Sequence, residues 1–292
     1  MKSNQFITQL FALFFAVILF VVIIKNYNIL GTYYKNSGKN VSSDDHYQLD
    51  VPKNTTVKSE SKKNKKKEKK LTKHEKLILS YQKADAYSIV DANSLSKKDI
   101  QKLFTISKIS DDTFKRMKGK SYKDNCTIPK SNLRYIRLLH NDGHNNTRIG
   151  ELVVNKSIAK TIRAIFLDLY EHQYPIEKMV LVDEYNADDN ASMADNNSSS
   201  FNYRVVEGSN KLSKHSLGLA IDINPKYNPY IHTLNGKTVC SPENGAEYAD
   251  RTKSFDYKID ENDYSYQLFT KYGFTWGGNW NSVKDYQHYE HN

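Results

Sequence analysis

Hydrophobic residues are distributed unevenly along the 292-residue chain and divide it into four zones. After a polar tip at residues 1–5, residues 6–24 are almost entirely apolar, and as a helix they would span about 28 Å, close to the apolar core of a bilayer. Residues 25–75 are polar and rich in Lys, Asn and Ser, with too few apolar residues to offset the entropy of ordering. From about residue 76 onward the pattern is that of a folded protein.

The apolar run 6–24 predicts a transmembrane signal anchor. No pattern of small residues for a signal peptidase follows it, so we expect it to remain uncleaved. Residues 1–5 would then be cytoplasmic, residues 25–75 a disordered tether, and the folded part extracellular. Whether the anchor is cut after export is left open.

Serines ahead of periodic segments predict helix starts in the folded zone. Ser96 and Ser110 each precede a charged turn and apolar positions at helical spacing, which is typical of N-caps. We therefore expect residues 76–124 to form a helical lead-in. Residues 133–140 and 148–155 flank the turn-rich sequence NDGHNNT, which predicts a β-hairpin.

Periodicity also assigns the next two segments. Residues 157–174 have apolar positions at helical spacing and are followed by Pro175, which predicts an amphipathic helix that stops there. The apolar run 179–185 predicts a buried strand. Together these elements indicate an α+β domain over residues 125–292, with a small antiparallel sheet and flanking helices.

The net charge of +10 is concentrated in one place. Between Lys53 and Lys76 there are eleven lysines against three glutamates. The remainder is close to neutral overall, so we expect a basic linker and not a folded basic surface, which argues against a nucleic-acid partner. The linker could meet anionic lipid headgroups or wall polymers. Cys126 and Cys240 match no zinc-ribbon or redox spacing, and either a bridge or two free thiols remains open.

The sequence SKHSLGLAID suggests a metal ligand pair. We predict a strand at 217–224, in which Gly218 and Ala220 keep one face clear beside Asp222 while His215 folds over the same face. A buried, hydrogen-bonded His–Asp pair would give the same pattern. A metal site therefore needs further ligands elsewhere in the chain.

The C-terminal sequence WGGNWNSVKDYQHYEHN supplies them. Asp285 and His288 are three residues apart and share one face if the segment is helical. A catalytic zinc site has three protein ligands and one open position, and His215, Asp222 and His288 provide the three. Asp285 is then a free carboxylate that can accept a proton from water. This ligand set would also accept other divalent ions.

Residues next to these ligands have supporting roles in the same hypothesis. We expect Trp276 and Trp280 to form an apolar wall beside the metal site, with Trp276 in contact with the substrate. Ordinary packing in the hydrophobic core is the alternative for both. We expect Ser213 to order the turn that follows it, and Glu290 or Tyr289 to orient the neighbouring histidine ring.

At this point the chain resembles a known family. The pattern S-x-H-x-x-G-x-A-x-D at residues 213–222, followed by WGG-x-W and D-x-x-H, is similar to the D-alanyl-D-alanine carboxypeptidase metallopeptidases. That group includes vancomycin-resistance-type D,D-carboxypeptidases and phage endolysins that cut L-alanyl-D-glutamate bonds. The resemblance extends over about residues 125–292, and it implies the α+β zinc fold shared with the Hedgehog signalling domain.

The resemblance also implies roles for individual residues. His215, Asp222 and His288 would bind zinc, and Asp285 would act as the base. The family uses an arginine upstream of the first motif to hold the substrate, and Arg204 is the candidate here. Its guanidinium could bind a carboxylate or a peptide carbonyl. A surface or strand-edge arginine is the alternative.

The expected function is that of a membrane-tethered zinc peptidase. Its substrate would be the stem peptide of peptidoglycan, cut at the terminal D-alanyl-D-alanine bond. An endopeptidase of the L-alanyl-D-glutamate type is the alternative, and a non-catalytic, zinc-stabilised wall-binding module is a third. The free carboxylate of Asp285 argues against the third. The composition of the stem peptide and the oligomeric state are left open by the sequence.

Overall fold

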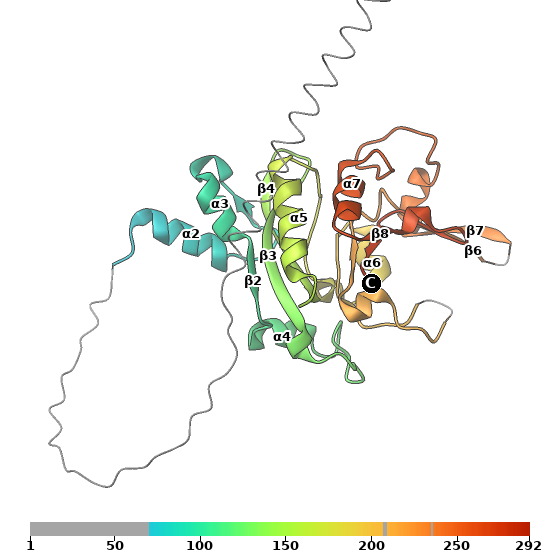
Figure 1. The fold of residues 1–292 in the computed structure, drawn as a ribbon, viewed down its shortest axis with the longest axis horizontal. Helices are drawn as coiled ribbons and strands as arrows, with labels where there is room; N and C mark the ends of the chain where they lie inside the picture. The colour runs from blue at the N-terminus through green and yellow to red at the C-terminus, as the bar shows by residue number, and fades with distance from the viewer. Residues whose placement is uncertain (1–69, 207–208, 235) are drawn as a thin grey trace, which may run out of the picture. The chain divides into compact units, whose positions relative to one another are not determined.

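The computed structural model describes residues 70–206, 209–234 and 236–292, which fall within one compact unit, Lys67–Asn292 (Figure 1). The α-helices of this part are α2 (Lys73–Lys83), α3 (Lys97–Leu103), α4 (Asp111–Met117), α5 (Ala159–Glu171), α6 (Asp189–Ala194) and α7 (Tyr264–Lys271). Its strands are β1 (Ile89–Val90), β2 (Thr105–Ser107), β3 (Leu133–Asn141), β4 (Thr147–Asn155), β5 (Ala220–Asp222), β6 (Tyr230–Leu234), β7 (Lys237–Ser241), β8 (Thr275–Trp276), β9 (Lys284–Asp285) and β10 (His288–Glu290).

The N-terminal predictions fall outside this range. The cytoplasmic tip at residues 1–5, the membrane helix at 6–24 and the linker up to residue 69 are not among the described residues. Within residues 70–292, apart from the gaps given above, no helix is long and apolar enough to cross a bilayer. The anchor and the tether up to residue 69 therefore stay predictions, whereas residues 73–75, expected in the disordered linker, already belong to α2, which Thr72 caps.

The β3–β4 hairpin forms the centre of the main sheet, whose strand order is β1-β4-β3-β2. Each of the two central strands has nine residues, and they pair antiparallel along their whole length. In the turn, the carboxylate of Asp142 accepts hydrogen bonds from the backbone N–H groups of His144 and Asn146, at 2.8 and 3.1 Å. The predicted hairpin is confirmed.

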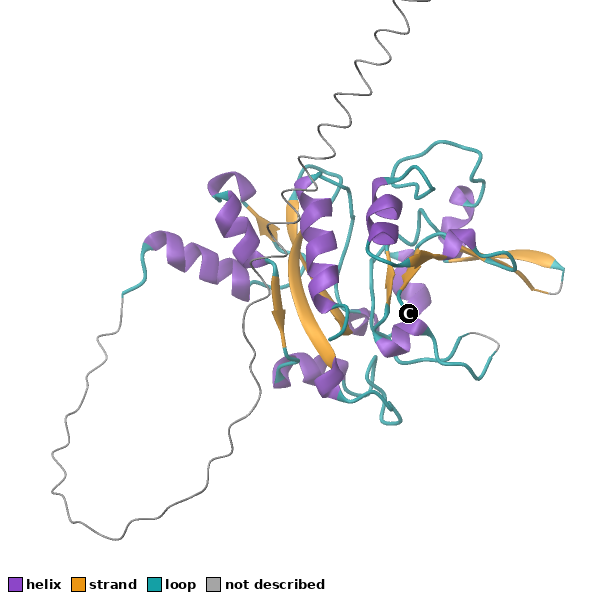
Figure 2. Cartoon of the chain, in the orientation of Figure 1, coloured by secondary structure: helices purple, strands orange, loops and turns teal. Residues whose placement is uncertain are grey.

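Helix α5 packs against β3 and β2 of this sheet, as the apolar spacing predicts (Figure 2). Its inward side chains, Ile162, Ile165, Phe166 and Leu169, are each at most 1% exposed. Burial of a side chain of this size contributes about 1.5–3 kcal/mol relative to exposure. The helix ends at Glu171, ahead of the predicted proline stop.

The lead-in segment 76–124 is partly helical and partly strand. Its N-caps are as expected, since Ser96 Oγ accepts a hydrogen bond from the N–H of Asp99 at 3.3 Å, and Ser110 Oγ from that of Thr113 at 3.1 Å. The segment also contains β1 and β2, the two edge strands of the main sheet. These strands have two and three residues, which is too short for an alternating pattern to be visible in the sequence.

The strand predicted at 179–185 is wrong. Met179 to Leu181 are buried but belong to no strand, and Val182–Tyr185 forms a 3₁₀ helix, η3. The side-chain amide of Asn197 takes the place of a paired strand: it accepts a hydrogen bond from the N–H of Val180 at 2.8 Å and donates one to the carbonyl of Val180 at 3.0 Å. The run is apolar because it is buried. Its backbone hydrogen bonds at Val180 are made by the side chain of Asn197, where a strand would pair with a neighbouring strand.

Two small antiparallel sheets, with strand orders β5-β10-β8 and β7-β6-β9, lie in the C-terminal part of the chain. β10 is joined to the core by Tyr289, which is fully buried and stacks on Phe269 of α7 with ring centroids 4.2 Å apart. Antiparallel sheets with several helices confirm the α+β class.

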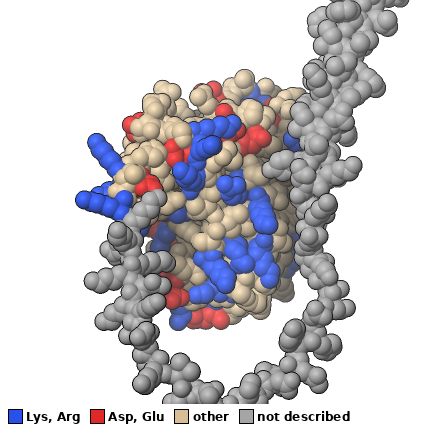
Figure 3. Space-filling model, turned by 60° about the vertical axis from the view of Figure 1, so that its left-hand side comes forward, with Lys and Arg blue, Asp and Glu red and all other residues tan. Residues whose placement is uncertain are grey.

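Charge is also divided within the folded part. Residues 77–137 contain thirteen Lys and Arg against six Asp and Glu, whereas residues 138–292 contain fifteen against twenty-one. Figure 3 shows Lys and Arg spread over the face that comes forward when the α2–α3 side is turned to the viewer. The near-neutral remainder expected from the sequence is therefore the sum of a basic N-terminal part and an acidic C-terminal part.

Candidate metal centre

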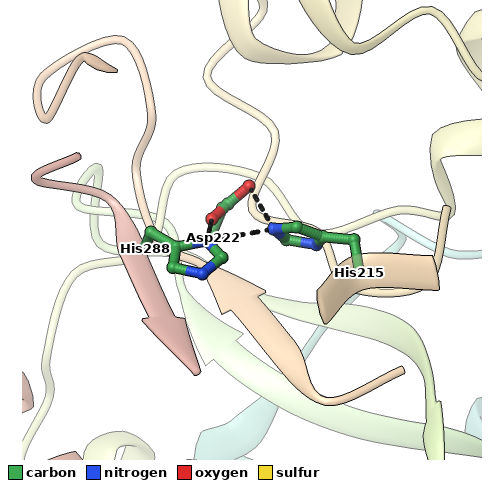
Figure 4. Close-up of side chains that lie close together, drawn as sticks. All are labelled: His215, Asp222 and His288. Atoms are coloured by element: carbon green, nitrogen blue, oxygen red, sulfur yellow. Dashed lines mark hydrogen bonds and ion pairs between the residues drawn. The ribbon is translucent and has the colours of Figure 1, made fainter. Parts of the chain in front are cut away.

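Side chains from three separate elements meet at one buried point (Figure 4). His215 Nε2 lies 3.2 Å from one carboxylate oxygen of Asp222, His288 Nδ1 lies 3.1 Å from the other, and the two ring nitrogens are 3.1 Å apart. The three residues are 3%, 8% and 5% exposed in chain order. The structure thus brings together the three side chains predicted as ligands.

Strand pairing places two of the three. β10 runs antiparallel to β5 with His288 directly opposite Asp222, and cross-strand partners carry their side chains on the same face. Asp285 and His288 flank a tight turn, so the helical spacing expected for them is wrong. A hydrogen bond from the N–H of Ile223 to the carbonyl of Gln287, at 3.0 Å, ties this turn to the chain that follows β5.

His215 is placed by a 3₁₀ helix, η4 (Lys214–Leu217). Ser213 caps this helix, its Oγ accepting from the N–H of His215 at 3.2 Å, as expected from the sequence. On the ring, Nδ1 lies 2.6 Å from the carbonyl oxygen of Ser200. When Nδ1–H donates to that carbonyl, the lone pair of Nε2 faces Asp222. Every residue has a main-chain carbonyl, so the sequence does not indicate which one contacts His215, and the contact with Ser200 was not predicted.

The role predicted for Gly218 is corrected. The strand expected at 217–224 is only Ala220–Asp222, and Gly218 instead ends η4 in the left-handed region, with φ of +66°. A Cβ at this position would lie 2.7 Å from the backbone nitrogen of Asn155, which donates to the Gly218 carbonyl at 2.8 Å. Glycine is required by the backbone turn and the approach to β4, and not by space beside the ligands.

The ring of His288 has neighbours on two further sides. Its Nε2 lies 3.2 Å from a carboxylate oxygen of Glu290, and the ring of Trp280 lies 5.2 Å away between centroids. Burial alone would lower the pKa of His288, but the hydrogen bonds to Asp222 and Glu290 raise it to about 10. Of the two residues expected to orient this ring, Glu290 contacts it, whereas Tyr289 points into the core.

The two aspartates have opposite electrostatics. Burial alone would raise the pKa of Asp222, but His215 and His288 hold it below its usual range, so this group is a carboxylate. Burial, opposed by the charge of His288 and aided by that of Asp222, raises the pKa of Asp285 to about 7. Oδ1 of Asp285 is buried without a hydrogen-bond partner among the residues that the structure describes. Such a carboxyl group can exchange a proton near neutral pH.

The donor set fits zinc. Two imidazole nitrogens and one carboxylate oxygen are typical of a catalytic zinc site. In a tetrahedral site with bonds of about 2.0–2.1 Å, ligand atoms lie about 3.3 Å apart. The two histidine nitrogens are 3.1 Å apart, each lies 3.1–3.2 Å from a different oxygen of Asp222, and each histidine has a partner on its other ring nitrogen. One ligand atom from each of the three residues lies within 4.8 Å of the other two, so the residues present fit a zinc ion.

The other two predicted site residues lie differently. Arg204 is ion-paired through Nε with Asp189 of α6, and its backbone N–H donates to Ser216 Oγ at 2.7 Å, next to the His215 turn. Trp276 is 4% exposed and belongs to the hydrophobic core, with its Nε1 donating to the carbonyl of Tyr286 at 2.8 Å. This placement favours packing over the predicted substrate contact for Trp276.

Two buried histidines and one buried aspartate, with the carboxyl group of Asp285 close enough to interact with their charges, form a group that could hold a metal ion. Residues 207–291 match the family model for D-alanyl-D-alanine carboxypeptidase, which confirms the resemblance suspected from the motifs. The matched segment contains all three candidate ligands and Asp285, whereas Arg204 precedes it. No curated protein and no solved structure matches the chain, and the Hedgehog-like fold name stays a prediction.

Replacement of Glu290 tests whether its hydrogen bond to the ring of His288 strengthens metal binding. We expect Glu290→Gln to lower zinc affinity about 10- to 100-fold, because the ring loses the charged partner that orients it and increases its basicity. Competition titration with a chromogenic chelator at neutral pH measures this. Glu261→Gln, at an exposed position, is the matched control. Equal affinity in the two variants would contradict the role of Glu290.

Replacement of Gly218 tests the turn that carries His215. We expect Gly218→Ala to reduce the free energy of unfolding by more than about 1 kcal/mol, because it adds both a strained positive φ and a steric clash. Gly119→Ala is the matched control, since Gly119 has a φ of +78° and no heavy atom within 4 Å of the added Cβ. Denaturant unfolding in the presence of a chelator gives both values. A loss that is no larger than the control's would show that the approach to Asn155 does not constrain this turn.

Proposed function

We propose that the chain is a zinc peptidase that hydrolyses the terminal D-alanyl-D-alanine bond of peptidoglycan stem peptides. The observation that carries the proposal is the buried group of His215, Asp222 and His288 beside the unpartnered carboxyl of Asp285. It lies within the segment that matches D-alanyl-D-alanine carboxypeptidase.

The protein's own residues would supply the proton transfers and the orientation. Zinc, when held by the three ligands, polarises the scissile carbonyl and lowers the pKa of a bound water. Asp285 takes the proton of the attacking water and delivers it to the leaving amine, which its pKa of about 7 permits near neutral pH. Arg204, oriented by Asp189 and adjacent to the His215 turn, donates hydrogen bonds to a carbonyl on the acyl side of the substrate.

The carboxyl group of Asp285, with one buried and unpartnered oxygen, favours catalysis over a purely structural zinc site. A structural zinc is usually enclosed by four protein ligands, whereas the described residues offer three at this point. A further acidic group that is close enough to be influenced by the ligands, yet unpartnered, has no role in such a structural site. The wall-binding module is therefore the weaker hypothesis.

We also propose that this enzyme is held at the outer face of the cell membrane. The proposal rests on the apolar run 6–24, the Lys-rich tether that follows it and the extracellular location of the proposed substrate. In this arrangement the tether would hold the folded unit Lys67–Asn292 off the membrane, in reach of the wall. Lysines of the tether would interact with anionic lipid headgroups or wall polymers.

Release of D-alanine tests the proposed reaction directly. Zinc-loaded Lys67–Asn292 should release D-alanine from a pentapeptide stem, and Asp285→Ala should lower kcat about 10²- to 10⁴-fold while zinc content is unchanged, because only the proton transfer is lost. Asp124→Ala, at an exposed position, is the control. Full activity of Asp285→Ala would refute the proposed mechanism.

Mass spectrometry of digested peptidoglycan separates the two peptidase hypotheses. A carboxypeptidase leaves tetrapeptide stems and free D-alanine, whereas an endopeptidase of the L-alanyl-D-glutamate type releases peptides from the glycan. Peptide release without D-alanine would replace the proposed reaction by the endopeptidase one and leave the metal centre in place.

A further inference from the structure

The hairpin of β6 and β7 extends from the strand that carries Asp285. β6 and β7 pair antiparallel, with Tyr230 opposite Ser241 and His232 opposite Val239. On its other side β6 pairs with β9, where Tyr230 lies opposite Asp285. In Figure 1 this hairpin projects away from the rest of the folded unit. The sheet therefore begins at the proposed catalytic base and continues outward.

One face of this sheet carries Asp285 together with residues of the hairpin. Side chains directly opposite each other, and those two positions apart on one strand, lie on the same face. Asp285, Tyr230 and His232 are related in this way, whereas Ile231 and Thr233 lie on the opposite face. The rings of Tyr230 and His232 stack with centroids 4.8 Å apart and an interplanar angle of 20°. The face thus presents a carboxyl group followed by an aromatic pair.

Two buried polar atoms on this face lack a partner. Oδ1 of Asp285 and Nδ1 of His232 are both buried, and neither makes a hydrogen bond within the described part of the chain. A buried polar atom without a hydrogen bond is costly, so such atoms are uncommon in folded proteins. Two of them on one face of one small sheet indicate a ligand that bonds to both.

We propose that His232 binds the C-terminal carboxylate of the residue that leaves. This inference rests on the proposed function, in which Asp285 delivers a proton to the leaving amine. Diagonal neighbours on paired strands lie about 7–8 Å apart, and one extended residue spans about 3.3–3.6 Å. Side chains that reach inward from these two positions can hold the two ends of one residue, its amine at Asp285 and its carboxylate at His232.

The chemistry of the face suits a single small residue with a free carboxylate. An imidazole N–H donates to a carboxylate, and a bond of this kind to a charged group is stronger than one to a neutral carbonyl. Tyr230 is opposite Asp285 and its ring stacks on that of His232, so the same face carries an aromatic surface that suits a side chain as small as a methyl group. Arg204, adjacent to the His215 turn and paired with Asp189, is left for the acyl side of the substrate.

A matched pair of substrates tests this assignment. Zinc-loaded Lys67–Asn292 is given a pentapeptide stem with a free C-terminus and the same peptide with a C-terminal amide. The wild-type protein should prefer the free acid about 10- to 100-fold in kcat/KM, mainly through KM, since the amide removes the charged acceptor. His232→Ala should lose this preference, because hydrolysis of the free-acid peptide becomes slower while hydrolysis of the amide peptide is unchanged. His232→Gln, which keeps an N–H donor, should retain part of the preference.

Thr233→Ala on the opposite face of the same strand is the control and should behave as the wild type. A preference for the acid that survives in His232→Ala overturns the inference and leaves the proposed function standing. If the wild-type protein cleaves neither peptide, the proposed function fails separately. Calorimetric binding of the two peptides then decides the assignment, because a carboxylate site at His232 still requires tighter binding of the acid in the wild type than in His232→Ala.

Discussion

The pairing of β10 with β5 is the constraint on which the site depends. It sets His288 opposite Asp222 and fixes the distance between their side chains before any ion is involved. Tyr289, on the reverse face of β10, is fully buried against Phe269, so the strand cannot shift its register without exposing a large aromatic side chain. Rigid strands position ligands more closely than loops do, and a tight turn joins β10 to β9, the strand that carries Asp285.

The pKa values of Asp222 and Asp285 are shifted in opposite directions, which suits them to different roles. Asp222 lies between two imidazoles that keep it ionised despite its burial, whereas Asp285 is half-buried, has a buried carboxyl oxygen without a bonded partner, and has a pKa of about 7. Two acidic groups with such different environments are typical of a site that divides ligation from proton transfer. The ligands in turn are oriented by Ser200 and Glu290, one a main-chain carbonyl and the other a side chain two residues from His288.

The identity of the site residues could be predicted from the sequence, because few residue types bind metals and their spacing is restricted. Local geometry was less predictable. The alternating pattern around Gly218 fits a strand as well as a 3₁₀ helix that ends in a left-handed glycine, and only the approach to Asn155 decides between them. The three-residue spacing from Asp285 to His288 likewise fits a helix or a tight turn.

Other features have no local signal at all. The carbonyl of Ser200 could come from any residue type, and the two edge strands β1 and β2 are too short to show a period. Of the two tryptophans, Trp280 contacts the ring of His288 while Trp276 is in the core, a choice made by tertiary packing. The hairpin, the main helix and the helix caps were predictable because each depends on neighbours in the sequence.

The central claim is that His215, Asp222 and His288 bind one zinc ion, and X-ray absorption at the zinc edge tests it most directly. Zinc-loaded Lys67–Asn292 should show one ion per chain with two imidazoles in its coordination shell, and His288→Ala should show one imidazole or no bound zinc. A spectrum without imidazole scattering, or one unchanged by this substitution, would contradict the account.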